Sequence, residues 1–427
     1  MDRQLHVLVV GGGGREHALA WKLAQSPRVE RVHVVPGNAG ISSANIPAED
    51  IPALLNYAVQ NRIDFTVVGP EAPLAEGIVD TFRAHGLKIF GPTRQAAQLE
   101  ASKAFAKALM TELGIPTAEA RTFTDYGEAA QYIEKLNRPI VVKADGLAAG
   151  KGVFVCDTPA DALDALRRIM QADEFGAAGA QVVIEERLTG REVSVLAFTD
   201  GKTVRLMPPA RDHKRIFDGD QGGNTGGMGA YTPVADVSPE LLEAIRRDVL
   251  QTAVDGMAAR GLPYIGVLYA GLMLTESGVK VLEFNCRFGD PETQVILPLL
   301  ESDLADVMLA CIDGRLDQVE VRWKPGACAA VVLASGGYPG AYRKGLPITG
   351  LDSVPNDVQV FHAGTSRNAD QIVTSGGRVL AVSATGDDLA SALAKVYAAV
   401  KGIHFEGAHY RRDIGGYAVP AALRNAP

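Results

Sequence analysis

Apolar runs alternate with helix-like stretches over roughly the first ninety residues of the chain. The runs HVLVV, RVHVV and DFTVV each end at Gly or Pro, LKIF closes the series, and segments such as HALAWKLAQ lie between them. This rhythm predicts a parallel α/β sheet, because buried parallel strands read as short apolar runs separated by helices. Ligands of such sheets bind beyond the carboxyl ends of the strands. We therefore expect a substrate platform on the turns at residues 11–14, 36–40, 69–71 and 91–93.

The pattern becomes richer in strands after a helical stretch at residues 102–114. The segments RPIVVKADG, GVFVCD, AQVVIEERL and REVSVLAFTDG predict strands, and VLYAGLMLT and VKVLEFN predict a strand pair. A long polar, glycine-rich segment at 202–231 reads as a loop, and a helix is expected over 239–260. Further on, ACAAVVLASGG and GGRVLAVSATG predict strands, and LASALAKVYAAVKG predicts a terminal helix.

These changes of pattern predict a multidomain protein that combines α/β and α+β folds. We place an N-terminal α/β substrate domain at residues 1–102, a second domain at 103–325 with a small lobe at about 120–190, and a C-terminal domain at 326–427. A chain of 427 residues is long enough for several such cores.

Composition and charge exclude several classes of partner. Apolar residues make up 47% of the chain and charged residues 22%, which is typical of a soluble globular protein. The net charge of −8 argues against nucleic acid or an anionic membrane as a partner, so we expect small-molecule substrates and take a monomer as the default. The first residues hold only about five apolar positions before the glycines, too few for a signal or membrane segment, which points to the cytoplasm. Reduced, buried thiols are expected at Cys156, Cys286, Cys311 and Cys328.

The first glycine run resembles a dinucleotide-binding turn only in part. Gly11 and Gly13 are followed by Glu16, so GxGxxG is incomplete, and the second strand ends at Val35-Pro36 without an acid for a ribose. NAD binding is therefore disfavoured. The turn either offers backbone amides to a phosphate or simply makes a tight bend, and the pattern leaves both open.

The segment VVKADGLAAGKGV indicates a phosphate-binding loop. Lys143 lies on a strand that faces a Gly/Ala-rich loop ending at Lys151. Glycine lets backbone amides approach phosphate oxygens, and a strand lysine adds a point charge. Gly152 follows Lys151, so this is not the GxxxxGK[ST] loop. An ordinary hairpin is the alternative, but two flanking lysines favour anion binding, and the loop could act as a lid over a nucleotide.

Two further segments carry weaker signals. VVIEERLTGREVSV places Glu185 and, seven residues later, Glu192 where strand ends could contact an adenine edge and a ribose, although surface acids at strand ends are common. The polar stretch at 211–233 has six glycines and several basic residues, which is typical of a functional loop. His213 within it is either a base or a positioning donor, and the sequence does not decide between them.

The strongest local signal is VLEFNCRFGDPETQ at residues 281–294. Strand alternation puts Glu283 and Asn285 on one face, where their oxygens could hold Mg²⁺ against phosphate oxygens. Arg287 and Asp290 follow on the exit turn. An outward-pointing acid on an edge strand would explain Glu283 but not the polar cluster behind it.

Together these segments resemble the ATP-grasp superfamily. They supply a first lysine at Lys103, a second at Lys143, the glycine loop, an E-E-x-L hinge at 185–188 and an E-x-N metal motif at 283–285. RFGDPETQ, with KADGLAAGKGV, DHKRIFDGD and NTGGMGAY in the same order, narrows the resemblance to the glycinamide ribonucleotide synthetase family over essentially the whole chain. Two positions depart from the family pattern. This chain has Arg187 where the family usually has an aromatic residue, and Gly223 where the family usually has a proline.

The resemblance implies a pre-ATP-grasp domain, a two-lobed ATP-grasp domain and a small C-terminal domain. It also implies that ATP phosphorylates the carboxylate of glycine and that the amine of 5-phosphoribosylamine attacks the product, which gives glycinamide ribonucleotide, ADP and phosphate in purine biosynthesis. The alternatives are another ATP-grasp ligase or carboxylase, and a non-catalytic nucleotide sensor. The sensor is disfavoured because Lys143, Glu283 and Asn285 are all present.

The same resemblance assigns roles to individual residues. Lys143, Arg287 and Asp290 would be catalytic, and Glu283 and Asn285 would bind Mg²⁺ or Mn²⁺. ATP would be bound by Lys103, Lys143, Glu185, Glu186, Leu188 and Glu192. The phosphoribosylamine site would draw on Gly13, Asn38, Gly40, Glu71, Asn224, Thr225, Arg287 and Asp290.

Overall fold

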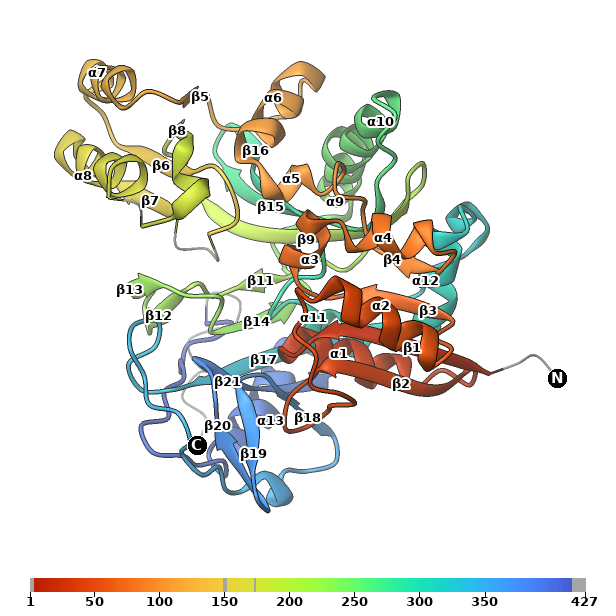
Figure 1. The fold of residues 1–427 in the computed structure, drawn as a ribbon. Coiled ribbons are helices and arrows are strands. Elements are labelled where there is room, and N and C mark those ends of the chain that lie inside the picture. The colour runs from red at the N-terminus through yellow and green to blue at the C-terminus, as the bar shows by residue number, and fades with distance from the viewer. Residues whose placement is uncertain (1–3, 149–151, 173, 417–427) are drawn as a thin grey trace.

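The N-terminal region is a parallel sheet, as the sequence predicts. In this computed structural model, which describes residues 4–148, 152–172 and 174–416, the strand order is β2-β1-β3-β4 and every pair is parallel. The strands are β1 (Leu5–Gly11), β2 (Val29–Pro36), β3 (Phe65–Val68) and β4 (Ile89–Phe90), and the helices are α1 (Gly14–Leu23), α2 (Ile51–Gln60), α3 (Glu71–Glu76) and α4 (Ile78–Ala84). Helices pack against this sheet, and β1 is buried from Val7 to Gly11 (Figure 1).

A small antiparallel sheet forms a separate lobe. Its order is β5-β8-β6-β7, and α7 and α8 cover the side that faces away from the rest of the molecule (Figure 1). The elements are β5 (Ala120–Phe123), α7 (Tyr126–Leu136), β6 (Ile140–Ala144), β7 (Val153–Cys156), α8 (Pro159–Met170), a 3₁₀ turn (Gly176–Ala180) and β8 (Val182–Glu186). The lobe has its own apolar core, which includes Val142, Leu166 and Ile184.

A larger antiparallel sheet lies beneath this lobe in the order β10-β9-β15-β16. Its strands are β9 (Arg191–Asp200), β10 (Val204–Leu206), β15 (Ile265–Thr275) and β16 (Gly278–Asn285), and its helices are α5 (Gln98–Ala101), α6 (Lys103–Leu113), α9 (Pro239–Ile245) and α10 (Thr252–Ala259). A π-helical segment (Arg246–Gln251) joins α9 to α10, so the helix predicted at 239–260 is confirmed. Connected helices α11 (Thr293–Ile296) and α12 (Leu304–Ile312) and 3₁₀ turns (Leu297–Leu299, Leu316–Gln318) lead towards the C-terminal region.

The C-terminal sheet recruits strands from the middle of the chain. Its order is β11-β14-β17-β21-β18, with α13 packed on β17 and β21. The elements are β11 (Arg211–Asp212), β14 (Gly229–Thr232), β17 (Ala327–Ala334), a 3₁₀ turn (Leu351–Ser353), β18 (Val358–His362), β21 (Arg378–Gly386) and α13 (Leu389–Val400), with hairpins β12–β13 (Arg215–Phe217, Gln221–Asn224) and β19–β20 (Thr365–Asn368, Gln371–Thr374).

The expectation that residues 202–231 form a loop is wrong. The segment contains β10 to β13 and reaches β14. β10, β11 and β12 are only two or three residues long, and the two glycines of β13 have low strand propensity, so the local sequence hides these strands. Pairing with a distant partner stabilises β14, whose Ala230 lies opposite Ala330 of β17.

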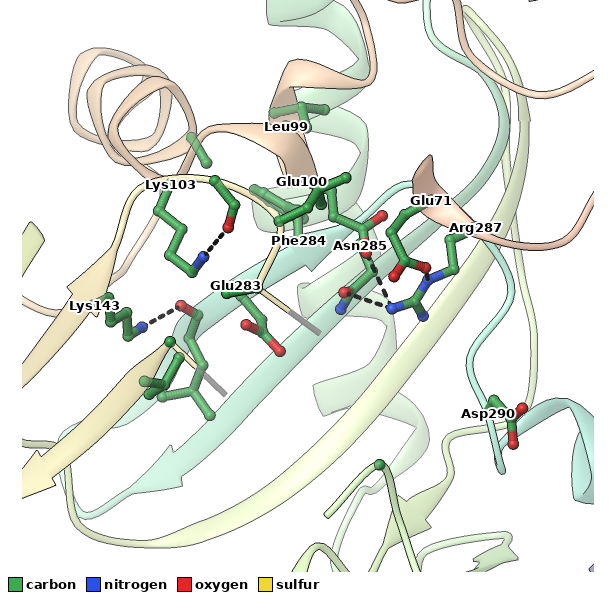
Figure 2. A pocket seen from close by; sticks show the side chains of 18 of the residues that line it. Glu71, Leu99, Glu100, Lys103, Lys143, Glu283, Phe284, Asn285, Arg287 and Asp290 are labelled. Atoms are coloured by element: carbon green, nitrogen blue, oxygen red, sulfur yellow. Dashed lines mark hydrogen bonds and ion pairs between the residues drawn. The ribbon is translucent and has the colours of Figure 1, made fainter. Parts of the chain in front are cut away.

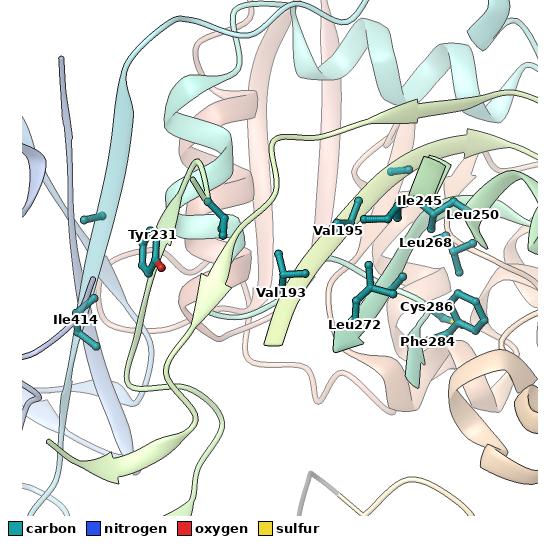
Figure 3. Packing of buried hydrophobic residues seen from close by; sticks show 14 of the residues in the cluster. Val193, Val195, Tyr231, Ile245, Leu250, Leu268, Leu272, Phe284, Cys286 and Ile414 are labelled. Atoms are coloured by element: carbon teal, nitrogen blue, oxygen red, sulfur yellow. The ribbon is translucent and has the colours of Figure 1, made fainter. Parts of the chain in front are cut away.

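One apolar core joins the large sheet to the C-terminal sheet. Figure 3 shows Leu272 and Phe284 towards one end, Tyr231 and Ile414 at the other, and Val193 between them. All four cysteines are free and buried, as predicted. Among the described residues, no helix has the length and apolar content needed to cross a membrane.

The N-terminal and C-terminal sheets meet at two histidines. The His17 ring of α1 and the His362 ring of β18 have centroids 5.6 Å apart, and the His362 backbone amide donates to Nδ1 of His17 at 2.9 Å. This hydrogen bond requires an unprotonated Nδ1. Burial, followed by the neighbouring His362, lowers the pKa of His17 to about 4, and burial, followed by Arg367, lowers the pKa of His362 to about 4.

We predict that this contact makes stability sensitive to acid. Between the ordinary pKa of 6.5 and the folded value of about 4, the unfolded chain binds protons that the folded chain does not. The free energy of unfolding therefore falls as pH is lowered through this window. Denaturant titrations at several pH values should show a shallower fall for H17N, whose amide oxygen can replace Nδ1 as acceptor, than for the exposed control H85N. An unchanged slope in H17N would contradict this explanation.

Candidate active site

A pocket of about 340 Å³ lies where the small lobe, the large sheet and the C-terminal sheet meet. Figure 2 shows Lys103 and Lys143 at one end, Glu283 and Asn285 in the middle, and Arg287 and Asp290 towards the other end. The predicted site residues that line it are Glu71, Lys103, Lys143, Glu185, Thr225, Glu283, Asn285, Arg287 and Asp290. The structure therefore brings together side chains that are more than two hundred residues apart in the sequence.

Lysines gather at the first end of the pocket, and two of them pair with one carboxylate. Lys143 of β6 lies 2.9 Å and Lys107 of α6 lies 3.3 Å from the two oxygens of Glu185, which is almost fully buried. Lys103 donates to the Gly146 carbonyl at 2.8 Å. Burial lowers the pKa of Lys107 to about 8 and also lowers that of Lys103. Lys103, Lys107 and Lys143 therefore gather at this end of the pocket, and their charges suit a polyphosphate.

Lys107 was missed in the sequence. It follows Lys103 by four residues, and residues with this spacing lie on one face of a helix. That spacing was the available signal. The predicted glycine loop also contributes to this end through Gly146, Leu147 and Ala148, while Lys151 lies outside the described residues.

The centre of the pocket holds the two candidate metal ligands. Glu283 and Asn285 alternate along β16 opposite Gly271 and Tyr269 of β15. Burial opposes ionisation of Glu283, but Lys214 and Lys143 outweigh it and hold its pKa below the ordinary value. An ionised carboxylate and an amide oxygen are donors that Mg²⁺ and Mn²⁺ accept. Within the described residues no group of three or more His, Cys, Asp or Glu side chains could hold a metal, so an ion at Glu283 and Asn285 would take its other oxygens from water or a bound ligand.

Arg287 anchors the second end of the pocket. Its guanidinium lies 3.2 Å from Glu71 of α3 and 3.0 Å from Glu100 of α5, and it donates to Asn285 at 3.2 Å. Burial opposes the charge, but Glu100 and Glu71 raise the pKa of Arg287 well above its usual range. Burial raises the pKa of Glu100 itself. Glu100 was missed because nothing in its local sequence distinguishes it from a surface acid on a short helix.

Asp290 is held from the C-terminal sheet. Arg378 Nη1 is 3.1 Å from its carboxylate, and the side-chain amide of Gln294 donates to the same oxygen at 2.8 Å. Burial acts against the charge, yet Arg378 and Arg15 hold the pKa of Asp290 below its usual value. Arg378 was also missed, since it is 88 residues from Asp290 and belongs to no motif.

Several predicted nucleotide contacts lie outside this pocket. Glu186 pairs with Lys280 at 3.4 Å, and Glu192 pairs with Lys214 at 2.6 Å. Arg187, the hinge departure, forms an ion pair with Asp157. Leu188 is also absent from the lining residues described. Their roles stay predictions.

The polar groups of the first two N-terminal turns form hydrogen bonds within the protein. The Gly13 amide donates to Glu16 at 2.6 Å, which favours the tight-turn interpretation of the first glycine run. Asn38 donates to the carbonyls of Gly12 at 3.0 Å and His362 at 2.8 Å, and its own oxygen accepts from the Gly40 amide. The predicted substrate roles of Gly13, Asn38, Gly40 and Asn224 stay predictions, because none of the four lines the described pocket.

His213 has the geometry of a positioning residue. It is buried, and the Gly415 amide donates to its Nε2 at 3.1 Å. Burial, followed by Arg411, lowers its pKa to about 4. This environment disfavours proton uptake near neutral pH.

Comparison with known proteins decides the family. Models of the phosphoribosylglycinamide synthetase N domain, ATP-grasp (A) domain and C domain match residues 5–100, 101–293 and 328–417. The chain belongs to the phosphoribosylglycinamide synthetase family. Its predicted ATP-grasp fold is thereby confirmed, while the boundaries at 102 and 325 and the extent of the small lobe stay predictions.

Members of this family are similar to the chain over nearly its whole length. Phosphoribosylamine–glycine ligase of Nostoc sp. is 55% identical over 421 residues, which are 96% of this chain and 99% of that protein. The ligase of Vibrio cholerae is 51% identical, with 97% and 99% covered. The chain spans 42% of the trifunctional purine biosynthetic protein adenosine-3 of Gallus gallus, at 54% identity over 97% of this chain.

Solved structures agree with this assignment. The crystal structure of phosphoribosylamine–glycine ligase from Thermotoga maritima has a TM-score of 0.85 and 35% identity, and covers 96% of this chain and 100% of that one. The biotin carboxylase domain of Hydrogenobacter thermophilus 2-oxoglutarate carboxylase has a TM-score of 0.72 at 15% identity, and covers 96% of this chain and 92% of that one. That second likeness shows a shared fold alone, so a carboxylase is not favoured.

Proposed function

We propose that this chain joins glycine to 5-phosphoribosylamine at the expense of ATP, giving glycinamide ribonucleotide, ADP and phosphate. The observation that carries the proposal is the placement of Arg287 and Asp290, from the RFGDPETQ segment, in one pocket with Lys103, Lys143 and Glu283. Relatives named phosphoribosylamine–glycine ligase, 50–55% identical over nearly the whole chain, support it.

The chemistry needs positioning more than a reactive side chain. A free carboxylate is a poor acyl donor, so one glycine oxygen first attacks the γ-phosphorus of ATP and ADP leaves. The amine of phosphoribosylamine then attacks the carbonyl carbon of glycyl phosphate, and phosphate leaves with one former glycine oxygen. Placing three substrates together and neutralising phosphate charge supplies most of the catalysis in such reactions.

The lysine end of the pocket is the proposed site for the phosphates of ATP. Lys103 and Lys143 lie on opposite lobes, so a bound polyphosphate would connect the two lobes. Glu185, Glu186 and Leu188 are proposed for adenine and Glu192 for the ribose. For Glu186 and Glu192 these roles require the ion pairs with Lys280 and Lys214 to open.

Glu283 and Asn285 are the proposed holders of Mg²⁺ or Mn²⁺. The pocket centre fits such an ion on the side of Glu283, which is kept ionised, while the Asn285 oxygen would have to release the hydrogen bond from Arg287. A divalent ion there would neutralise charge on the transferring phosphoryl group.

The arginine end of the pocket is the proposed site for phosphoribosylamine. Glu71, Thr225, Arg287 and Asp290 line it, and carboxylates fixed by arginines can accept hydrogen bonds from ribose hydroxyls. We also propose that the chain works in the cytoplasm, with a monomer as the default that a net charge of −8 favours.

The proposal is tested by measuring ADP release while substrates are omitted in turn. With Mg-ATP, glycine and phosphoribosylamine generated from ribose 5-phosphate and ammonia, we expect turnover only when all are present. Turnover with bicarbonate in place of glycine would contradict the ligase and favour a carboxylase on the same fold.

We further predict that Glu283→Gln raises the metal requirement. The substitution removes the negative charge from a direct ligand, and loss of even an outer-shell partner typically costs about 10–100-fold in metal affinity. The half-saturating Mg²⁺ concentration for ADP release should rise at least about tenfold on this basis. Glu276→Gln, on the exposed turn before β16, is the matched control. Equal Mg²⁺ titrations of the two variants would remove Glu283 from the ligand set.

A further inference from the structure

Arg378 connects the C-terminal sheet to the active-site pocket. It is the first residue of β21, and it lines the pocket with a side chain 22% exposed. Its Nη1 donates to the Gly226 carbonyl at 2.6 Å and to the Asp290 carbonyl at 2.8 Å, and lies 3.1 Å from the Asp290 carboxylate. One guanidinium therefore fixes two separate segments that face the substrate end of the pocket.

The first of these segments carries Asp290. Its carboxylate is 15% exposed, so an unpaired charge there would be costly. Gln294 contributes a neutral donor at 2.8 Å, while Arg378 supplies the ion pair. Without Arg378, the carboxylate would lose its ion pair and keep only the charge of Arg15 nearby, and its backbone carbonyl would lose a donor.

The second segment is the turn at Thr225 and Gly226. The Gly226 amide donates to the Tyr338 hydroxyl at 2.9 Å, so two side chains of the C-terminal region hold this turn. A Cβ atom at Gly226 would lie 2.9 Å from Cζ of Arg378. The turn thus packs directly against the guanidinium, and a residue larger than glycine would displace one of them.

We infer that Arg378 is a positioning residue of the ligase site, which orients Asp290 and the Thr225–Gly226 turn towards phosphoribosylamine. The inference rests on the proposed function and deepens it, because it makes the C-terminal sheet part of the substrate site. Arg378 acts through its neighbours at the arginine end, whereas the nucleotide end depends on Lys103, Lys143 and Glu185.

A purely structural role for Arg378 predicts a different result. If it only fastened the C-terminal sheet, its loss would lower stability and affect all ligands alike. A positioning role predicts a selective loss at one end of the pocket. Binding of a stable ligand for each end separates the two cases.

The test compares R378M and R378K with R343M. Arg343 is an exposed arginine of the C-terminal region whose side chain is 72% exposed and pairs with Glu406, away from the pocket. Calorimetry measures binding of glycinamide ribonucleotide, the stable product, and of Mg-ADP, and thermal unfolding checks the fold. R378M removes charge-assisted hydrogen bonds, which are stronger than neutral ones. We therefore expect it to weaken product binding about 10–100-fold. Mg-ADP binding should change less than about twofold, since its contacts are untouched.

R378K keeps the charge beside Asp290 but not the planar guanidinium, so its product affinity should lie between those of R378M and the unaltered chain. In a D290N background, R378M should cost less than it does alone, because coupled residues are not additive. If R378M does not fold, the product and Mg-ADP affinities of R378K are compared with those of R343M instead.

Equal product affinity in R378M and R343M would overturn the inference, as would parallel losses of product and Mg-ADP binding. Failure of the unaltered chain to bind glycinamide ribonucleotide at all would instead overturn the proposed function. The two failures are therefore distinguished by the unaltered chain alone.

Discussion

Burying ionised side chains is costly unless each charge is paired, and the pocket depends on this constraint throughout. Glu185 is shared by Lys107 and Lys143, Arg287 is shared by Glu71 and Glu100, and Asp290 is held by Arg378. Most of these pairs join segments from different sheets or lobes. The charges can be accommodated only when those parts assemble, so the same interactions hold the domains together and create the site.

The arrangement also separates the chemistry spatially. Lysines gather at one end, arginines paired with acids lie at the other, and Glu283 stands between them with its charge maintained by Lys214 and Lys143. A polyphosphate suits the first end and a hydroxyl-rich sugar suits the second. The carboxylate to be activated would then meet the γ-phosphate near the centre, where a divalent ion and the lysines can neutralise developing charge.

Much of this could be predicted from the sequence, because the signals are local. The apolar runs gave the parallel sheet, strand alternation placed Glu283 and Asn285 on one face, and the exit turn supplied Arg287 and Asp290. The missed features are long-range. The short β14 becomes a strand by pairing with β11 and β17, and Arg378 reaches Asp290 across 88 residues. Lys107 could have been predicted from its spacing of four residues after Lys103 on a helix, whereas nothing in the sequence around Glu100 indicates a role in the site.

The central claim is that the glycine carboxylate is activated by phosphorylation in this pocket. Glycine labelled with ¹⁸O in its carboxylate tests it most directly, when it is turned over with ATP and phosphoribosylamine and the phosphate is examined by mass spectrometry. The account predicts one ¹⁸O atom in each phosphate released, because that oxygen leaves with the phosphoryl group. Unlabelled phosphate alongside glycinamide ribonucleotide would show that the bond forms without an acyl phosphate and would contradict the account.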